Sequence, residues 1–255
     1  MSAPGSLRII GLGPGSEAWI TPEASALVAK ATDLIGYAPY LERLPITPGQ
    51  KRHQSGNGAE LERARHALRL AGNGCHVALV SGGDPGIFAM AAAVFEAIEE
   101  GEPSWRDMDI AVIPGLSAMQ AAAARIGAPL GHDFCAISLS DNLKPWPLIE
   151  KRLSAAASAD FVIALYNPAS IARPHRIHDA FTLLRDLKPA STPVVFARAV
   201  GRADERILVK SLASADPGLA DMSTLVIVGS SESRIVPRNG LTPFVYTPRE
   251  VKVSR

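Results

Sequence analysis

Three glycine-containing loops hold the residues whose types and spacing favour binding of a small ligand. They are Gly11-Leu12-Gly13-Pro14-Gly15-Ser16, Ser81-Gly82-Gly83-Asp84-Pro85-Gly86 and Pro114-Gly115-Leu116-Ser117-Ala118. Each follows a short apolar run typical of a strand, and glycine lets the backbone approach a ligand closely. Ligands of α/β sheets bind outside the carboxyl ends of the strands, so the three loops predict one shared binding crevice.

Each loop taken alone also has a plainer interpretation. The first has the spacing GxGxG with Pro14 inside it, whereas dinucleotide-binding proteins use GxGxxG running directly into a helix. A tight turn from strand to helix explains that loop alone equally well. Ser117 alone is best explained as a helix cap. Only the agreement of all three loops favours a ligand site.

The elements that position these loops follow from the hydrophobic pattern. Short aliphatic runs alternate with longer amphipathic runs, which indicates an α/β fold with mainly parallel sheets. Strands are expected at 7–12, 77–80, 110–113, 161–166, 194–200 and 225–228. Helices are expected at 22–31, 59–71, 87–100, 117–125, 147–157 and 176–187. In the last helix one apolar face is formed by Ile177, Phe181, Leu184 and Leu187.

Chain length favours two domains. A single core rarely grows beyond about 250 residues, and the chain has 255. The segment Gly127-Ala128-Pro129-Leu130-Gly131 is rich in turn formers. The expected domains are therefore residues 1–119 and 120–255. The polar segment 50–58, QKRHQSGNG, is expected to be a surface loop, either a lid or a loop without function.

Composition limits the classes of partner and compartment. Lys plus Arg number 26 against 25 Asp plus Glu, so no overall basic field favours nucleic acid. Cys75 and Cys135 are the only cysteines, which is too few for a disulfide framework and fits a reducing cytoplasm. No run approaches the ~20 apolar residues of a membrane span, and the amino terminus lacks the pattern of a signal peptide. A soluble cytoplasmic protein without membrane or nucleic-acid partners is expected.

Four further segments extend the pattern of the three loops along the chain. They are ISLSDNLKPW at 137–146, LYNP at 165–168, AVGR at 199–202 and TLVIVGS at 224–230. Together with the loops, they resemble the tetrapyrrole methylases, the S-adenosylmethionine enzymes that modify uroporphyrinogen and the precorrins, and within them the C(17)-methyltransferase branch. The resemblance covers nearly the whole chain. Ser16 departs from it, because many relatives carry Asp at that position.

The resemblance implies a fold, a cofactor and an assembly. It implies two α/β domains with S-adenosylmethionine folded into the cleft between them, and usually a homodimer. Matching motifs assign cofactor contacts in the first domain to Pro14, Gly82, Gly83, Asp84, Ser117 and Ala118. In the second domain they assign them to Tyr166, Asn167, Ala199, Met222, Ser223 and Thr224.

The resemblance also implies a reaction, which is methylation of precorrin-3B at ring carbon 17 with contraction of the macrocycle to precorrin-4. Methyl transfer is an in-line displacement and requires neither metal nor covalent nucleophile. Contraction requires proton transfer, so a general acid or base is expected. The first candidate is Asp141, with His132 and Asp133 as the second choice. The structural alternatives are a helix cap for Asp141 and a backbone-bonded turn histidine for His132.

A precorrin carries acetate and propionate arms, so its pocket should display cations. Three segments supply them: Arg173 to His178; Lys51, Arg52 and His53; and Arg202 with Arg206. A solvated surface explains any one of these residues, but Arg173 and Arg202 together favour substrate binding. Trp146 is either a core residue or a flat wall against the macrocycle.

Two rival functions stay open at this stage. The chain could methylate another acceptor, such as a cobalt-bearing precorrin of the anaerobic route, because the ring can bring its own metal without a protein ligand. Alternatively, it could be a non-catalytic protein that binds a nucleotide or a tetrapyrrole. The segments of the second half favour the enzyme, since a simple dinucleotide module would lack them.

Overall fold

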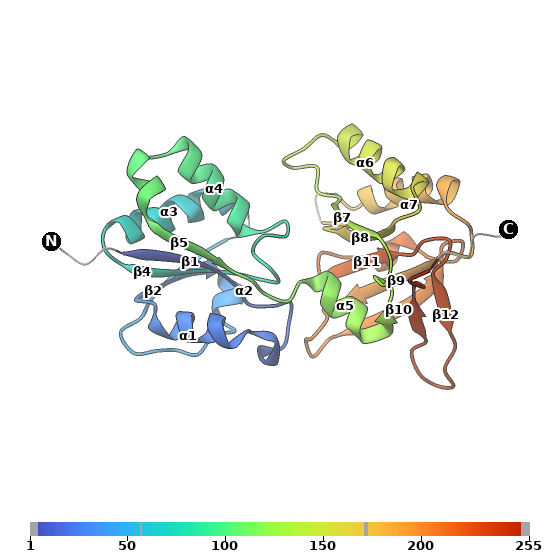
Figure 1. The fold of residues 1–255 in the computed structure, drawn as a ribbon, viewed down its shortest axis with the longest axis horizontal. Coiled ribbons are helices and arrows are strands. Elements are labelled where there is room, and N and C mark those ends of the chain that lie inside the picture. The colour runs from blue at the N-terminus through green and yellow to red at the C-terminus, as the bar shows by residue number, and fades with distance from the viewer. Residues whose placement is uncertain (1–4, 57, 171–172, 251–255) are drawn as a thin grey trace. The chain divides into compact units, whose positions relative to one another are not determined.

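The computed structural model describes residues 5–56, 58–170 and 173–250. The chain divides into two compact units, Met1–Ala118 and Met119–Arg255, coloured blue to green and green to red in Figure 1. Each unit has its own sheet and its own hydrophobic core. The predicted α/β fold class is confirmed.

The first unit is a parallel sheet covered on both faces. Its strands lie in the order β3-β2-β4-β1-β5, and all four neighbouring pairs are parallel. The strands are β1 (Ser6–Gly11), β2 (Asp33–Tyr37), β3 (Lys51–Ser55), β4 (His76–Ser81) and β5 (Asp109–Ile113). Only β2 and β3 are neighbours both in the chain and in the sheet. The other connections cross over one strand, and a crossover of that kind carries a helix across a face of the sheet.

Four α-helices connect these strands. They are α1 (Pro22–Lys30), α2 (Ala38–Leu41), α3 (Glu60–Gly72) and α4 (Met90–Glu100), with 3-10 helices at Glu17–Trp19 and Pro103–Asp107. Thr21 caps α1 by accepting from the Ala24 N–H, and Pro22 occupies the first turn, where it costs no hydrogen bond. One core cluster joins the sheet to α3 and α4. A second joins the opposite face to α1 and α2, as Figure 1 also shows.

The second unit has a mixed sheet in the order β10-β9-β11-β8-β7. Its strands are β7 (Phe134–Ser138), β8 (Val162–Tyr166), β9 (Pro193–Arg198), β10 (Arg206–Ser211) and β11 (Thr224–Val228). Only β7 and β8 pair in parallel; the other three pairs are antiparallel. The expected parallel pairing therefore holds in the first sheet but not in the second. For β9 and β10 the cause is the short connection between them, which has no helix and therefore permits antiparallel pairing only.

Helices α6 (Trp146–Ser158) and α7 (Arg176–Leu187) cover one face of this sheet. Ile177, Phe181 and Leu184 of α7 are buried as predicted, whereas Leu187 at its end is 42% exposed. The remaining elements are α5 (Ala118–Ile126), which begins at the last residue of the first unit, a 3-10 helix at Pro217–Leu219, and a small sheet of β12 (Arg234–Val236), β13 (Phe244–Tyr246) and β6 (Gly127–Ala128).

One prediction about an element was wrong. Lys51–Ser55, expected to be part of a surface loop, is the edge strand β3 and pairs with β2 along its whole length. A polar edge strand has one face in contact with solvent, so it lacks the apolar run that identifies the central strands. Residue 57 of the same segment lies outside the described residues.

Candidate functional site

The three glycine-containing loops of the first unit lie at the carboxyl edge of its sheet and contact one another through backbone atoms. Gly13 and Gly83 exchange two hydrogen bonds, with N···O distances of 3.2 Å and 3.0 Å. A Cβ added to Gly115 would lie 2.4 Å from the carbonyl oxygen of Gly83. This close approach requires glycine, and it brings the loops together as the sequence predicted.

Asp84 connects two of the loops through its carboxylate. Oδ1 accepts from the Gly86 N–H at 2.8 Å, and Oδ2 accepts from the Gly115 N–H at 3.1 Å. Carboxylates that accept from backbone N–H groups form strong hydrogen bonds. Asp84 therefore holds the second and third loops in register, in addition to any contact it makes with a ligand.

The second loop has open space beside it. Gly83 has a φ of +69°, and nothing lies within 4 Å of a Cβ built on it. In contrast, a Cβ on the neighbouring Gly82 would meet the ring of Tyr40 at 2.7 Å. A bare backbone that faces open space at the carboxyl edge of a parallel sheet is the arrangement a small ligand requires.

The other cofactor candidates of the first unit lie around these loops. Pro14 is half-buried in the first loop, Ser117 is 1% exposed, and Ala118 begins α5. Ser16, the departure from the family pattern, accepts from the Ala18 N–H and caps the following 3-10 helix. Sequence reasoning missed Arg43, whose guanidinium donates to three carbonyls of the first loop. An isolated arginine in a polar segment gives no sequence signal for such a role.

Lys51 and Arg52, two of the predicted substrate-binding cations, lie near the amino ends of the strands in the same sheet. Lys51 and Arg52 begin β3, level with Asp33 and Leu34 at the start of β2. The glycine loops follow the carboxyl ends of the parallel strands, so the structure does not bring these cations to the loops. The guanidinium of Arg52 donates to the carbonyls of Leu41, Leu44 and Pro45.

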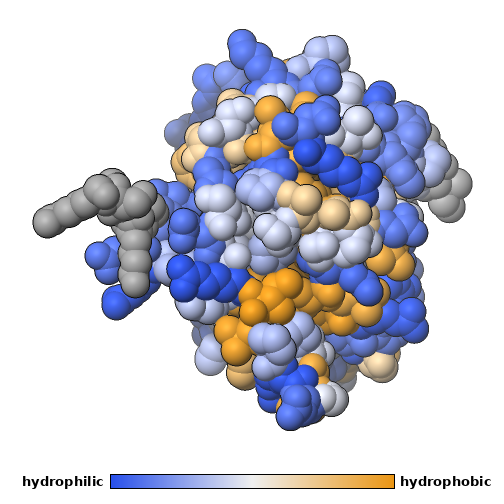
Figure 2. Space-filling view, turned by 90° about the vertical axis from the view of Figure 1, so that its right-hand side faces the viewer, coloured by the Kyte–Doolittle hydropathy of each residue, from blue (hydrophilic) through white to orange (hydrophobic). Residues whose placement is uncertain are grey.

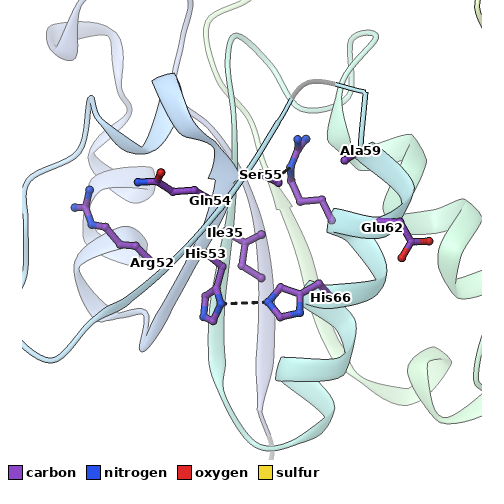
Figure 3. A pocket seen from close by; sticks show the side chains of 9 residues that line it. Ile35, Arg52, His53, Gln54, Ser55, Ala59, Glu62 and His66 are labelled. Atoms are coloured by element: carbon purple, nitrogen blue, oxygen red, sulfur yellow. Dashed lines mark hydrogen bonds between the residues drawn. The ribbon is translucent and has the colours of Figure 1, made fainter.

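A pocket of about 460 Å³ lies between β3 and α3, and its lining includes Ile35, His53, Ser55, Glu62 and His66. Figure 3 shows the imidazoles of His53 and His66 facing each other, and their Nδ1 and Nε2 atoms lie 3.2 Å apart. The other ring nitrogen of His53 lies 2.8 Å from the buried carboxylate of Asp33. Burial acts to raise the pKa of Asp33, but hydrogen bonds from His53, Thr32 and Cys75 lower it overall.

The pKa of His66 is lowered by burial and by the charges of His53 and Arg69, against a smaller opposing effect of Asp33. A neutral His66 agrees with the hydrogen bond between the imidazoles, in which one nitrogen must accept. Asp33, His53 and His66 therefore form a hydrogen-bonded row, of which the two imidazoles line the pocket.

The candidates of the second unit gather at one edge of its sheet. Tyr166 ends β8 and Asn167 follows it, and Ala199 follows β9. Thr224 begins β11, which runs antiparallel to both, so its first residue lies beside Arg198 at the end of β9. Asn167 and Ala199 have φ values of +51° and +50°. Such conformations are strained for residues other than glycine and concentrate at functional sites.

A carboxylate organises the turn that contains Met222 and Ser223. Asp221 Oδ1 accepts from the Ser223 N–H at 2.9 Å and from the Thr224 hydroxyl at 2.7 Å. Burial acts to raise the pKa of Asp221, but these hydrogen bonds and the ion pair with Arg198 lower it overall. The Ser223 carbonyl in turn accepts from the Ala199 N–H at 2.9 Å. The turn and the end of β9 are therefore held together.

Asp141, the first catalytic candidate, lies at the same edge after β7 and is paired with two arginines. Arg176 donates to Oδ2 at 2.7 Å, and Nε of Arg173 lies 3.6 Å from Oδ1. Burial acts to raise the pKa of Asp141, but the hydrogen bond and the charges of Arg176 and Arg173 hold it below its ordinary value of 3.8. The side chain is an ionised anchor for two cations.

Trp146 and Arg202 complete the predicted substrate residues. The Arg176 guanidinium lies over the ring of Trp146, 4.7 Å from its centroid, and Trp146 also packs against the core of the second unit. Both interpretations of Trp146 thus have support in its contacts. Arg202 is exposed in the turn after β9. The structure brings Arg173 and Trp146 into one cluster around Arg176.

His132 and Asp133, the second catalytic choice, lie at the opposite end of β7. They precede its first residue, Phe134, whereas Asp141 follows its last, Ser138. Five strand residues span about 16 Å, so these residues and Asp141 cannot act on the same atom. Asp133 is 82% exposed and its carboxylate lies 3.9 Å from His132 Nδ1.

Comparison with known proteins agrees with this arrangement. The family model of the Tetrapyrrole (Corrin/Porphyrin) Methylases matches residues 6–216. The chain is 58% identical over 245 residues to the precorrin-3B C(17)-methyltransferase of Sinorhizobium sp, with 96% of each chain covered. It is 43% identical to the probable cobalt-factor III C(17)-methyltransferase of Salmonella typhimurium, with 94% of this chain and 99% of that protein covered.

Solved structures give the same result. The crystal structure of the methyltransferase CobJ matches with a TM-score of 0.91 and 49% identity, covering 96% of this chain and 100% of that one. Uroporphyrin-III C-methyl transferase from Thermus thermophilus, complexed with S-adenyl homocysteine, matches with a TM-score of 0.66 over 88% of this chain and 92% of that one. At 21% identity the latter likeness concerns the fold alone. Among the described residues, no helix has the length and apolar character to cross a membrane.

Proposed function

The chain belongs to the tetrapyrrole (corrin/porphyrin) methylase family, and on this basis we propose that it transfers a methyl group from S-adenosylmethionine to C17 of precorrin-3B. Contraction of the ring accompanies the transfer and gives precorrin-4. The observation that carries this proposal is 58% identity, over 96% of both chains, to a precorrin-3B C(17)-methyltransferase. Identity at that level, without large gaps at either end, favours the same acceptor as well as the same reaction class.

A second acceptor has a specific observation in its favour. The chain is 43% identical to a probable cobalt-factor III C(17)-methyltransferase. Both acceptors would be methylated at the same ring carbon, so the same donor site and the same transfer geometry would serve either. The higher identity to the precorrin-3B enzyme makes the metal-free ring our first choice.

When bound, S-adenosylmethionine would supply a methyl group attached to a sulfonium. Transfer of this methyl group turns the sulfonium into a neutral thioether, which is the leaving group. The residues present fit this cofactor, because the loops of the first unit offer a bare backbone beside open space at Gly83. We assign its contacts there to Pro14, Gly82, Gly83, Asp84, Ser117 and Ala118. In the second unit we assign them to Tyr166, Asn167, Ala199, Met222, Ser223 and Thr224. Rigid loops accelerate such a displacement by alignment of donor and acceptor.

For the tetrapyrrole, we assign carboxylate binding to Arg173, with Trp146 as an apolar wall and Arg202 as a further cation. Asp141 holds Arg173 and Arg176 at the edge of the second sheet. Its lowered pKa supports an orienting role more than that of a proton carrier, because a general base is most effective when its pKa lies near the working pH. His132, Asp133, Lys51 and Arg52 receive no support from their positions, because each lies at the start of a strand and the other candidates gather at the strand ends opposite.

Assembly and compartment complete the proposal. We propose a homodimer, supported by the apolar side chains that the second unit exposes, among them Ile235, Val236, Leu241 and Phe244. A cytoplasmic location is supported by the free thiols of Cys75 and Cys135, because free thiols suit a reducing compartment.

The decisive experiment is incubation of the purified protein with S-adenosylmethionine and precorrin-3B, followed by product mass and carbon-labelled NMR. The expected product carries one additional methyl group at C17 and a contracted ring. The same incubation with cobalt-factor III tests the second acceptor. If neither ring gains a methyl group, the proposal is wrong.

Calorimetry separates the enzyme from a simple binding protein. We expect S-adenosylhomocysteine to bind and NAD not to bind. Binding of NAD alone would favour a dinucleotide-binding module instead.

A further inference from the structure

Arg43 lies two residues after α2 and reaches the first glycine loop. Its Nη1 donates to the Gly13 carbonyl at 2.9 Å, and its Nη2 donates to the carbonyls of Leu12 at 2.7 Å and Gly15 at 3.0 Å. One guanidinium therefore holds three of the four carbonyls between residues 12 and 15. The planar fork of the guanidinium suits this arrangement, because it presents several donors on separate nitrogens in a fixed geometry.

The atoms that Arg43 binds also connect the loops to each other. The Gly13 carbonyl accepts from Arg43 and from the Gly83 N–H, at 3.0 Å. A loop with glycine at positions 11, 13 and 15 has more backbone freedom than a loop without glycine. Fixing its carbonyls on one side removes much of this freedom before a ligand arrives, and preorganisation of that kind increases affinity.

The segment that contains Arg43 is itself anchored. Arg52 of β3 donates to the carbonyls of Leu41 and Leu44, on either side of Arg43, at 2.8 Å and 3.1 Å. Arg52 of the edge strand therefore fixes the segment that contains Arg43, and Arg43 fixes the first loop. This gives Arg52 an orienting role in place of the substrate contact that its sequence neighbourhood predicted.

We infer that Arg43 is a positioning residue for the methyl donor, acting through the backbone of residues 12–15 and not through direct contact. The inference rests on the proposed function, since it requires that the first loop binds S-adenosylmethionine. It assigns donor affinity to a residue outside all the motifs of the family pattern. Loss of the fork should weaken donor binding and leave tetrapyrrole binding unchanged.

The test is Arg43→Lys, which keeps the charge but replaces the two nitrogens of the fork by one ammonium nitrogen on a shorter side chain. Calorimetry should show the Kd for S-adenosylhomocysteine raised about tenfold, equivalent to about 1.4 kcal/mol. In steady-state kinetics, the KM for S-adenosylmethionine should rise by a similar factor while the KM for the tetrapyrrole stays constant. A purely structural role would instead change both KM values together, along with Tm.

The control is Arg185→Lys in the second unit. Arg185 also holds backbone carbonyls, those of Leu212 at 3.4 Å and Ala215 at 2.7 Å, and its replacement should leave the Kd for S-adenosylhomocysteine unchanged. A third variant, Arg43→Ala, should regain affinity for S-adenosylhomocysteine when millimolar guanidinium ion is added, because the free ion replaces the missing fork.

The outcomes are separable. If the wild-type protein fails to bind S-adenosylhomocysteine, the proposed function fails first. If the wild type binds S-adenosylhomocysteine and both Arg43→Lys and Arg43→Ala bind it with the wild-type Kd, the inference is overturned and the proposed function stands. An equal loss of affinity in Arg185→Lys would also overturn it, because the effect would then reflect general stability.

Discussion

Asp141 illustrates how neighbouring charges set the chemistry of a single side chain. A carboxylate next to two arginines stays ionised across the neutral range, since its pKa is held below 3.8. Such a group orients cations well and accepts protons poorly. The partially exposed cluster of Asp141, Arg173, Arg176 and Trp146 is therefore best explained as a binding surface for the carboxylate arms of the ring.

Asp141→Asn tests this role directly. We expect the KM for the tetrapyrrole to rise about tenfold, the size of one lost charge-assisted contact, while kcat changes little and the Kd for S-adenosylhomocysteine stays constant. If Asp141 were the general base, kcat should fall by about 100-fold or more. The pH profile separates the two, because a group with a lowered pKa titrates below pH 3.8 and adds no acid limb near neutrality.

Gly83→Ala tests the open space beside the second loop, with Gly49→Ala as its matched control. Both glycines have positive φ, +69° and +81°, and neither has an atom within 4 Å of an added Cβ. Each replacement should lower the free energy of unfolding by about 1–2 kcal/mol through backbone strain. Only Gly83→Ala should also weaken S-adenosylhomocysteine binding, measured by calorimetry. Equal affinities in the two variants would contradict the assignment of Gly83.

At the scale of elements, the packing of the edge strand β3 against helix α3 makes the stability of the fold depend on pH. His53 and His66 line the pocket of Figure 3 and contact each other through their imidazoles. The other ring nitrogen of His53 contacts Asp33, which lies outside the lining of the pocket. The pKa of His66 lies below its ordinary value of 6.5. As the pH falls through 6.5, the unfolded chain therefore takes up a proton at this position before the folded chain does, and the folded state loses stability.

His66→Gln should remove this part of the pH dependence. In urea unfolding between pH 7.5 and 5.5, the wild type should lose stability toward acid, and the variant should lose less. The depressed pKa values of Asp33 and Asp141 act at lower pH and do not disturb the comparison. An identical slope in both proteins would mean that His66 has the same pKa in the folded and unfolded chains.

At the scale of the whole molecule, the exposed apolar surface bears on assembly. Figure 2 shows a patch of hydrophobic residues bordered by hydrophilic ones. Contiguous apolar patches on soluble proteins mark interaction sites. In the hairpin of β12 and β13, Val236 is 42% exposed and Phe244 is 46% exposed, so this hairpin is our candidate for the contact with a second copy.

Val236→Glu should therefore shift the protein from dimer to monomer in sedimentation experiments. A charge buried at a contact without a partner costs several kcal/mol, enough to dissociate a dimer at micromolar concentration. Ile46→Glu is the control, because Ile46 is 86% exposed in the first unit and lies outside the hairpin. A monomeric wild type, or a dimer unaffected by Val236→Glu, would remove the hairpin from the interface.

The sequence by itself determined the elements and motifs with strong local signals. Central strands such as β8 and β11 are nearly continuous apolar runs, and α7 has a clear helical period, so both kinds of element were predictable. The glycine loops were also predictable from local sequence, because glycine itself indicates a position where the backbone must lack a side chain. The family followed from the order of these motifs along the chain.

Tertiary structure alone decided what depends on residues far apart in sequence. The pairing of the polar strand β3 with β2 and the antiparallel pairing in the second sheet depend on which strands folding places side by side, and no local pattern encodes that. The same holds for Arg43 and for the paired state of Asp141, since a hydrogen bond or a pKa is set by whichever groups folding brings within a few ångströms. Local sequence fixes the conformation of a segment, whereas long-range packing fixes its neighbours.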